Sequence, residues 1–205
     1  MADTARALTQ KYDSAAPKWR DKMRALGYYD GYLGFLSAPG LRPTRDAHVL
    51  DVGCGTGAMA EAWVAVNGTP ERMTLLDPSE VMVRQAGQTL AQRHVTAQLR
   101  IGMLGDALPK ADEVLAAHVI EHCPYPAEAL ISLKALLKPR GVLRLVVSKP
   151  HWCNAIIWLQ WQHQTFTRPQ MDALFEDTGL KLLSDYRFPS GPPSRTSHGY
   201  VLQAR

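Results

Sequence analysis

The stretch His48-Val-Leu-Asp-Val-Gly-Cys-Gly-Thr-Gly57 decides the fold, because an apolar run leads directly into a glycine-rich turn. Residues 48–52 are predicted to form a buried strand, and residues 58–66 the helix that follows the turn. Glycines at such a turn let the backbone pass close to a ligand, where a side chain would block the approach. The stretch therefore predicts a strand–loop–helix unit that binds a small molecule at its loop.

The chain continues the same alternation on the C-terminal side of this unit. Strands are predicted at 73–76, 97–102, 113–118 and 142–148, and helices at 79–93 and 126–137, with Gly141 closing a turn. Ser79 is the expected N-cap, because its hydroxyl can accept from a free backbone N–H. A last unit comprises a helix at 168–177 and strands at 180–188 and 199–204, joined by a Pro189–Pro193 loop without a helix.

This order predicts an α/β fold with a doubly wound, mostly parallel seven-stranded sheet in a three-layer sandwich. The last two strands are expected to form an antiparallel hairpin at one edge. Residues 1–46 are helical in character, with breaks at Gly27 and at the Pro39-Gly40 and Pro43 turns. We expect them to form an N-terminal helical lid. Residues 47–205 then form the ligand-binding domain, with a substrate-side insertion at about 150–167.

Composition narrows the class of protein. The 205 residues fit one domain, and 46% hydrophobic with 20% charged residues is ordinary for a globular protein. The net charge is +4 without a dense basic run, which disfavours a nucleic-acid partner. Three cysteines without metal-finger spacing favour a reducing compartment. No signal segment and no apolar stretch long enough to cross a bilayer are recognisable, so the expected location is cytoplasmic.

The loop spacing separates two classes of ligand. A dinucleotide-binding loop places its third glycine one position later than Gly57, where this chain has Ala58. Asp77 follows Gly57 by 20 positions, at the end of the second predicted strand, and can accept from both hydroxyls of a ribose. The alternatives are a tight structural turn at the glycines and a turn role for Asp77 before Pro78. The spacing favours a nucleoside that carries no pyrophosphate.

Five ordered segments resemble the motifs of class I S-adenosylmethionine (SAM)-dependent methyltransferases: 49–57, 74–79, 105–107, 112–118 and 136–143. The resemblance spans about residues 47–149 and, more loosely, the rest. It implies SAM as the methyl donor, S-adenosylhomocysteine (SAH) as product and a small-molecule methyl acceptor. Cys54 and Thr56 are common variants of the loop, and Arg140 stands where glycine is frequent, which affects a surface turn.

The resemblance also assigns roles to residues. Asp77 holds the ribose, Asp106 meets the adenine amino group, and the backbone N–H of Ala107 meets a ring nitrogen. The segment 12–19 is similar to a lid whose aromatic residue closes over the donor, although simple helix packing is the alternative. The residues expected at the donor are Tyr12, Trp19, Asp51, Gly53, Cys54, Gly55, Gly57, Asp77, Pro78, Met82, Asp106, Ala107, His118 and Val119.

The segment His118-Val-Ile-Glu-His122 is expected to face the acceptor, because ligands bind at the carboxyl ends of parallel strands. His122 is the candidate general base, since its ordinary pKa suits neutral pH. The alternative is that its ring only packs against the loop. His118, Glu121 and His122 are also similar to a divalent-metal arrangement of small-RNA and quinone-type O-methyltransferases, with a further ligand from His151 or His163. We predict no metal.

Residues 151–163 contain three of the five tryptophans and directly follow the fifth predicted strand. We expect this segment to overhang the site, where aromatic walls bind an apolar ring or, by cation–π attraction, an amine. A core helix, a dimer surface and a membrane-surface contact are the alternatives. The residues expected at the acceptor are Glu121, His151, Trp152, Trp158, Trp161 and His163.

The sequence thus predicts a SAM-dependent methyltransferase that acts on an N, O or C nucleophile of a small molecule, as a monomer or homodimer. A phospholipid or lipid-amine N-methyltransferase in peripheral membrane contact is the nearest enzymatic alternative. A SAM-binding scaffold or regulatory subunit without activity is the alternative of another class.

Overall fold

A seven-stranded sheet organises the protein, which we describe from a computed structural model for residues 18–38, 46–151 and 164–204. The strand order is β3-β2-β1-β4-β5-β7-β6. Neighbouring strands are parallel except β7, which runs antiparallel to both β5 and β6. The strands are β1 His48–Val52, β2 Arg72–Asp77, β3 Ala97–Ile101, β4 Ala111–Ala117, β5 Leu137–Ser148, β6 Leu180–Tyr186 and β7 Ser197–Ala204. The predicted mostly parallel sheet with a C-terminal hairpin at one edge is confirmed.

Helices cover both faces of the sheet. The central strands alternate between two hydrophobic clusters: Val142 and Val146 of β5 face one, and Leu143 and Leu145 face the other. The first cluster contains residues of α2, α3 and α4, and the second contains residues of α5 and α7. The helices are α2 Tyr28–Ser37, α3 Ala58–Asn67, α4 Glu80–Ala91, α5 Pro126–Ala135, α7 Arg168–Asp177 and α8 Gly191–Thr196, with the 3-10 turn η1 Ile120–His122. Double burial explains why these strands are apolar on both sides.

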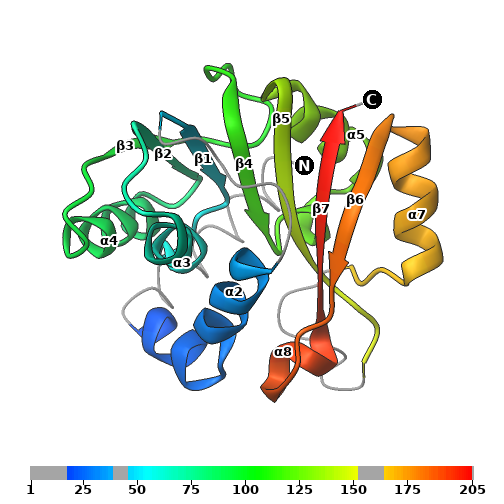
Figure 1. Cartoon of the computed structure of the whole chain (residues 1–205), viewed down its shortest axis with the longest axis horizontal. Coiled ribbons are helices and arrows are strands. Elements are labelled where there is room, and N and C mark those ends of the chain that lie inside the picture. Colours follow the sequence, from blue (N-terminus) through cyan, green and yellow to red (C-terminus); the bar gives the residue numbers. More distant parts are fainter. Residues whose placement is uncertain (1–17, 39–45, 152–163, 205) are drawn as a thin grey trace.

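The carboxyl ends of the parallel strands meet at one end of the molecule. Figure 1 shows α2 and α8 at this end, below the arrowheads of β4 and β6. The strand order also reverses here, because β2 lies on one side of β1 and β4 on the other. Such a reversal opens a crevice between the loops that follow the two strands. The fold therefore predicts a ligand site between the β1 and β4 ends.

Two local expectations are wrong. The segment between the last two strands contains α8, because Pro192 and Pro193 occupy its first turn, where no backbone N–H donor is needed. Strand β5 begins at Leu137, five residues before the expected start, and the helix before it ends at Ala135. The turn expected at Gly141 is a break in the β4–β5 register, where Arg140 adopts a left-handed φ of 66°.

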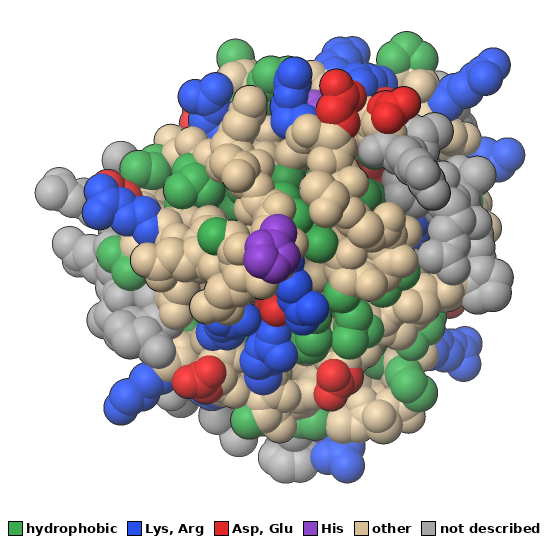
Figure 2. All heavy atoms as spheres, turned by 60° about the vertical axis from the view of Figure 1, so that its left-hand side comes forward, with side chains coloured by type: hydrophobic (Ala, Val, Ile, Leu, Met, Phe, Trp, Pro, Cys, Tyr) green, Lys and Arg blue, Asp and Glu red, His purple; other side chains and the backbone are tan. Residues whose placement is uncertain are grey.

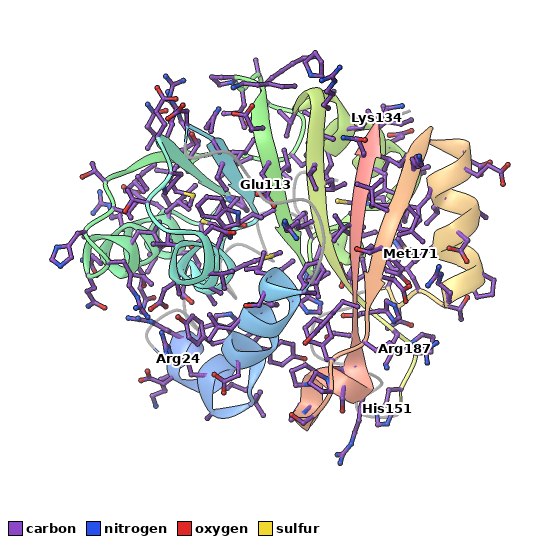
Figure 3. All side chains as sticks on the ribbon, viewed as in Figure 1. Arg24, Glu113, Lys134, His151, Met171 and Arg187 are labelled. Atoms are coloured by element: carbon purple, nitrogen blue, oxygen red, sulfur yellow. The ribbon has the colours of Figure 1, made fainter. Side chains whose placement is uncertain are left out.

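A charged cluster joins the N-terminal helical segment 18–25 to α3. Glu61, which is 3% exposed, accepts hydrogen bonds from Arg20, Arg24 and Arg93. Arg24 also lies over the Tyr29 ring, 4.1 Å from its centroid. Figure 2 shows Lys and Arg side chains gathered around an acidic side chain on the side of the molecule that carries α3 and α4. Figure 3 places Arg24 at the lower left, by the N-terminal helical segment. This cluster holds the N-terminal segment against the sheet domain.

A second, fully buried cluster fixes α3 on the sheet. Trp63 Nε1 donates to Glu113 Oε2 at 2.8 Å, and Glu113 also pairs with Arg144 of β5. Figure 3 shows Glu113 inside the molecule, between the α3 layer and the strands. Because the pair is buried, removing either partner would leave an uncompensated charge.

Over the described part of the chain, no helix combines the length and apolar character that crossing a membrane requires.

Candidate active site

The glycine loop after β1 leaves room for a ligand against its backbone. Gly53 and Gly55 have left-handed φ angles of 64° and 50°. A Cβ on Gly53 would lie 2.6 Å from Val119 Cγ2, whereas a Cβ on Gly55 would meet no atom within 4 Å. Gly57, at φ 84°, packs against Ala86 of α4 in a way that a Cβ would crowd at 3.1 Å. The absence of a side chain thus permits close packing at Gly53 and Gly57, whereas the space next to Gly55 is open.

Asp77 at the end of β2 ties this loop to the next unit. Its Oδ2 accepts from the backbone N–H of Gly55 at 2.9 Å, and its Oδ1 accepts from that of Ser79 at 2.9 Å. Ser79 in turn caps α4 by accepting from Met82 N at 3.1 Å, which confirms the predicted N-cap. A carboxylate accepts hydrogen bonds through both oxygens, which is the chemistry that binding the two hydroxyls of a ribose requires.

Asp51 is a buried carboxyl group beside the loop. It is 1% exposed, and its Oδ2 has no hydrogen-bond partner among the residues that the structure describes. Burial raises the pKa of Asp51 to about 8, a hydrogen bond from the backbone of Ala60 opposes that rise, and the charge of Asp77 adds to it. A cationic group placed against Oδ2 would satisfy this oxygen and favour the ionised carboxylate.

The other residues expected at the donor follow the carboxyl ends of β1, β2 and β3. Met82 is fully buried at the start of α4, and Pro78 before it is exposed. The Cys54 thiol is buried and donates to Gly55 O at 3.6 Å, and burial raises its pKa well above the ordinary range. Asp106 is exposed and its Oδ2 accepts from Met103 N at 2.9 Å, with Ala107 exposed beside it. The described residues of the expected donor set therefore come from three strand ends, from the loop after β1 to the loop after β3.

The segment after β4 places its polar groups inward. His118 has a left-handed φ of 58°. Its Nδ1 lies 2.9 Å from Glu121 Oε1 and 3.0 Å from Ser148 Oγ, and its Nε2 lies 3.4 Å from Ser197 Oγ. His122 is half-buried in η1. Because η1 is a single 3-10 turn that excludes His118, the segment forms a hydrogen-bonded turn and not a ligating helical face. Among the described residues, no group of three or more His, Cys, Asp or Glu could hold a metal ion.

Helix α2 contributes two tyrosines that the sequence reasoning missed. Tyr28 packs edge-on against His118, with ring centroids 5.7 Å apart, and its hydroxyl lies 2.9 Å from Thr196 Oγ1 of α8. Tyr32 is buried, and burial, then Tyr28, Asp51 and Glu121, raise the pKa of its phenol. The i, i+4 spacing of these two tyrosines after Gly27 is a signal that could have identified them.

Of the other expected residues, the structure describes Trp19 and His151. Trp19 is half-buried in the helical segment 18–25, and His151 is half-buried after β5. Figure 3 places His151 at the end of the molecule where α8 lies. Tyr12, Trp152, Trp158, Trp161 and His163 lie outside the described residues. Gln164, where the description resumes, donates from its backbone N–H to Glu121 O at 3.0 Å, so the chain at Gln164 is attached to η1.

Comparison with known proteins agrees with this geometry. A family described as "Methyltransferase domain" matches residues 50–143. The ubiquinone biosynthesis O-methyltransferase of Haemophilus ducreyi is 37% identical over 102 residues, 47% of this chain and 43% of that protein. The enzyme of the same name from Methylococcus capsulatus is 31% identical over 150 residues, 65% of this chain and 58% of that protein. The chain spans about half the length of the curated relatives it matches.

Solved structures share the fold. The Burkholderia thailandensis 1,6-didemethyltoxoflavin-N1-methyltransferase, with that compound and SAH bound, has a TM-score of 0.75 at 20% identity, and the likeness covers 100% of this chain and 90% of that one. The magnesium protoporphyrin IX methyltransferase of Synechocystis with bound SAH has a TM-score of 0.69 at 17% identity and covers 97% and 99%. At these identities the likeness establishes the architecture.

Proposed function

We propose that this chain is a class I SAM-dependent methyltransferase, which transfers the methyl group of SAM to a small molecule and leaves SAH. The matched domain, the relatives and the shared fold support this proposal. The observation that carries the proposal is the buried Oδ2 of Asp51, which has no partner within the described part of the chain. Asp51 precedes Gly55 by four residues, and the loop meets open space where a Cβ on Gly55 would lie. The α-ammonium of an amino-acid-bearing nucleoside would satisfy that oxygen. A nicotinamide dinucleotide offers no such group.

The described residues fit SAM along its length. Asp51 would hold the ammonium, Asp77 the ribose hydroxyls and Asp106 the adenine amino group, while the glycine loop lets the backbone approach. SAM supplies a methyl group on a positively charged sulfur, which is a good leaving group. The chain itself contributes alignment and exclusion of water. Tyr28 and Tyr32 of α2 are buried, and Tyr28 packs against His118 after β4, which supports a covering role for residues 1–46.

The acceptor is proposed to bind between α2, η1 and the end of β5. Tyr28, His118 and Glu121 come together there, and Gln164 joins the returning chain to η1. His151 and the tryptophans at 152, 158 and 161, with His163, are proposed as further walls, and His122 remains a candidate base. The O-methyltransferase relatives support a hydroxyl acceptor, and the domain match supports methyl transfer in general.

Isothermal titration calorimetry with SAM and SAH tests the donor site. Asp77→Asn should weaken SAH binding by about tenfold or more, because two hydrogen bonds to a charged group are weakened. Asp177→Asn, an exposed aspartate at the end of α7, is the matched control and should bind SAH like the wild type. A wild-type chain that bound neither compound would refute the proposal. Binding of SAM that forms no SAH with any offered acceptor would instead indicate a SAM-binding scaffold.

A further inference from the structure

Glu121 has one oxygen that is fully engaged and one that is not. Oε1 accepts from the backbone N–H of Ser148 at 2.6 Å and from His118 Nδ1 at 2.9 Å. Oε2 is buried and has no hydrogen-bond partner among the described residues. A buried acceptor without a donor destabilises the fold, because it has lost its hydrogen bonds to water and gained none in return. Anchoring η1 to β5 requires only Oε1, so the anchoring role leaves Oε2 unexplained.

The surroundings keep this carboxyl group ionised. Burial acts to raise its pKa, but the hydrogen bond and charge of His118 and the backbone N–H of Ser148 outweigh burial, so the pKa of Glu121 lies below its ordinary value. The His118 proton is expected on Nδ1, since that nitrogen faces a carboxylate oxygen. Nε2 of the same ring lies 3.4 Å from Ser197 Oγ.

The carboxylate is held from several elements at once. His118 directly follows β4, Ser148 ends β5, and Tyr28 of α2 packs against the imidazole. His118 occupies this position with a left-handed backbone, which is strained for a residue with a Cβ. Backbone strain of this kind persists where the surrounding structure fixes it, and it concentrates at functional sites. The arrangement gives Oε2 a fixed direction.

The position of Glu121 relates it to the donor loop. Val119, two residues earlier, packs so closely on Gly53 that a Cβ there would lie 2.6 Å from Val119 Cγ2. The Tyr32 phenol is influenced by both the Asp51 and the Glu121 carboxyl groups, so this ring is near both. Glu121 therefore lies at the border between the donor site and the proposed acceptor space.

We propose that Glu121 Oε2 accepts the proton of a neutral hydroxyl on the methyl acceptor, and that His118 is the positioning residue that fixes Glu121. This inference rests on the proposed function. The acceptor oxygen forms a bond to the methyl carbon while the carbon–sulfur bond breaks and its electron pair stays on sulfur. The hydroxyl proton passes to Oε2 and from there to water. An oxygen that gains a methyl group while still protonated is a strong acid, so a carboxylate is a sufficient base.

Two acceptors that differ in ionisation test the proton transfer. Catechol is neutral at the assay pH of 8, and 4-nitrocatechol is largely ionised. Glu121→Gln should lower kcat on catechol by about a hundredfold, the usual lower range for a lost general base, and change kcat on 4-nitrocatechol by less than threefold. Its Kd for SAH by calorimetry should stay within threefold of the wild type. Glu176→Gln, an exposed site on α7, is the control and should change neither.

The double variant tests the role of His118. If His118 acts only through Glu121, His118→Gln combined with Glu121→Gln should lose no more activity on catechol than Glu121→Gln alone. Equal losses on both acceptors, or no loss on either, would overturn the proposal, because a structural defect does not distinguish a neutral from an ionised phenol. SAH binding without methylation of either phenol would also overturn it while leaving donor binding intact. Failure of the wild type to bind SAH would instead refute the proposed function.

Discussion

Ionisation of Asp51 should couple donor binding to pH. With a pKa of about 8 in the free protein, about one tenth of the molecules carry an Asp51 carboxylate at pH 7 and about one hundredth at pH 6. If binding of the ammonium group of SAH requires the carboxylate, the apparent Kd for SAH should fall about tenfold as the pH rises from 6 to 7. Close to one proton should be released per SAH bound at pH 7.

Calorimetry measures both quantities. The binding enthalpy is compared in phosphate and Tris buffers at pH 7, whose different ionisation enthalpies reveal the released proton, and the Kd is followed from pH 6 to pH 7. Asp51→Asn should abolish the pH dependence and the proton release, whereas Asp177→Asn should retain both. A flat Kd with no proton release in the wild type would show that Asp51 is already ionised when free. The argument from its burial would then be wrong.

The raised pKa of Asp51 also predicts an effect on the stability of the fold. A carboxyl group whose folded pKa lies above its unfolded value stabilises the fold below the unfolded pKa, and this contribution is lost as the pH rises toward the folded pKa. For a rise from 3.8 to about 8, the loss by pH 7 is about 4 kcal/mol. Asp51→Asn removes this penalty, so urea unfolding should show the variant more stable than the wild type at pH 7, with the difference vanishing near pH 4. Equal stability at pH 7 would contradict the assignment.

Three further variants test the loop and the N-terminal segment. Gly53→Ala meets both a left-handed φ and Val119 Cγ2 at 2.6 Å, so it should lower the free energy of unfolding by about 1–2 kcal/mol or more and abolish SAH binding. Gly55→Ala carries the backbone penalty without the clash, so urea unfolding should show a smaller loss than for Gly53→Ala, and a larger one would argue against the Val119 contact. Glu61→Gln removes the charge that three arginines share, and amide hydrogen exchange over residues 18–25 should speed up, with the exposed Glu71→Gln as control. Unchanged exchange would mean that the cluster does not hold this segment.

Local patterns were sufficient for most of the elements. The strand at His48–Val52 and the helix at Arg168–Asp177 lie where the apolar periodicity and caps predicted them, and Ser79 caps α4 as expected. These features depend on short-range rules: side-chain period, helix termini and turn chemistry. The start of β5 and the helix α8 were missed, since both depend on register with β4 or on prolines that act as a helix start instead of a loop.

Residues of the candidate site divide in the same way. Gly53, Gly55, Gly57 and Asp77 could be singled out because spacing along one strand–loop–helix unit and its successor is a local property of the chain. The hydrogen bond from Gly55 N to Asp77 Oδ2 joins the two expected parts of one site. For the acceptor side, the sequence could nominate Glu121 and His118, but it gave no direction for either side chain.

Sequence alone determined the order of the strands along the chain and the chemistry available at the glycine loop, because both follow from neighbours along the chain. Only the tertiary structure decided which groups meet across it. Tyr28 of α2 reaches His118 over a separation of 90 residues, and Ser148 fixes one oxygen of Glu121 while the other stays without a partner in the described structure. Burial and long-range hydrogen bonding set these relations, and neither is encoded in any local pattern of residues.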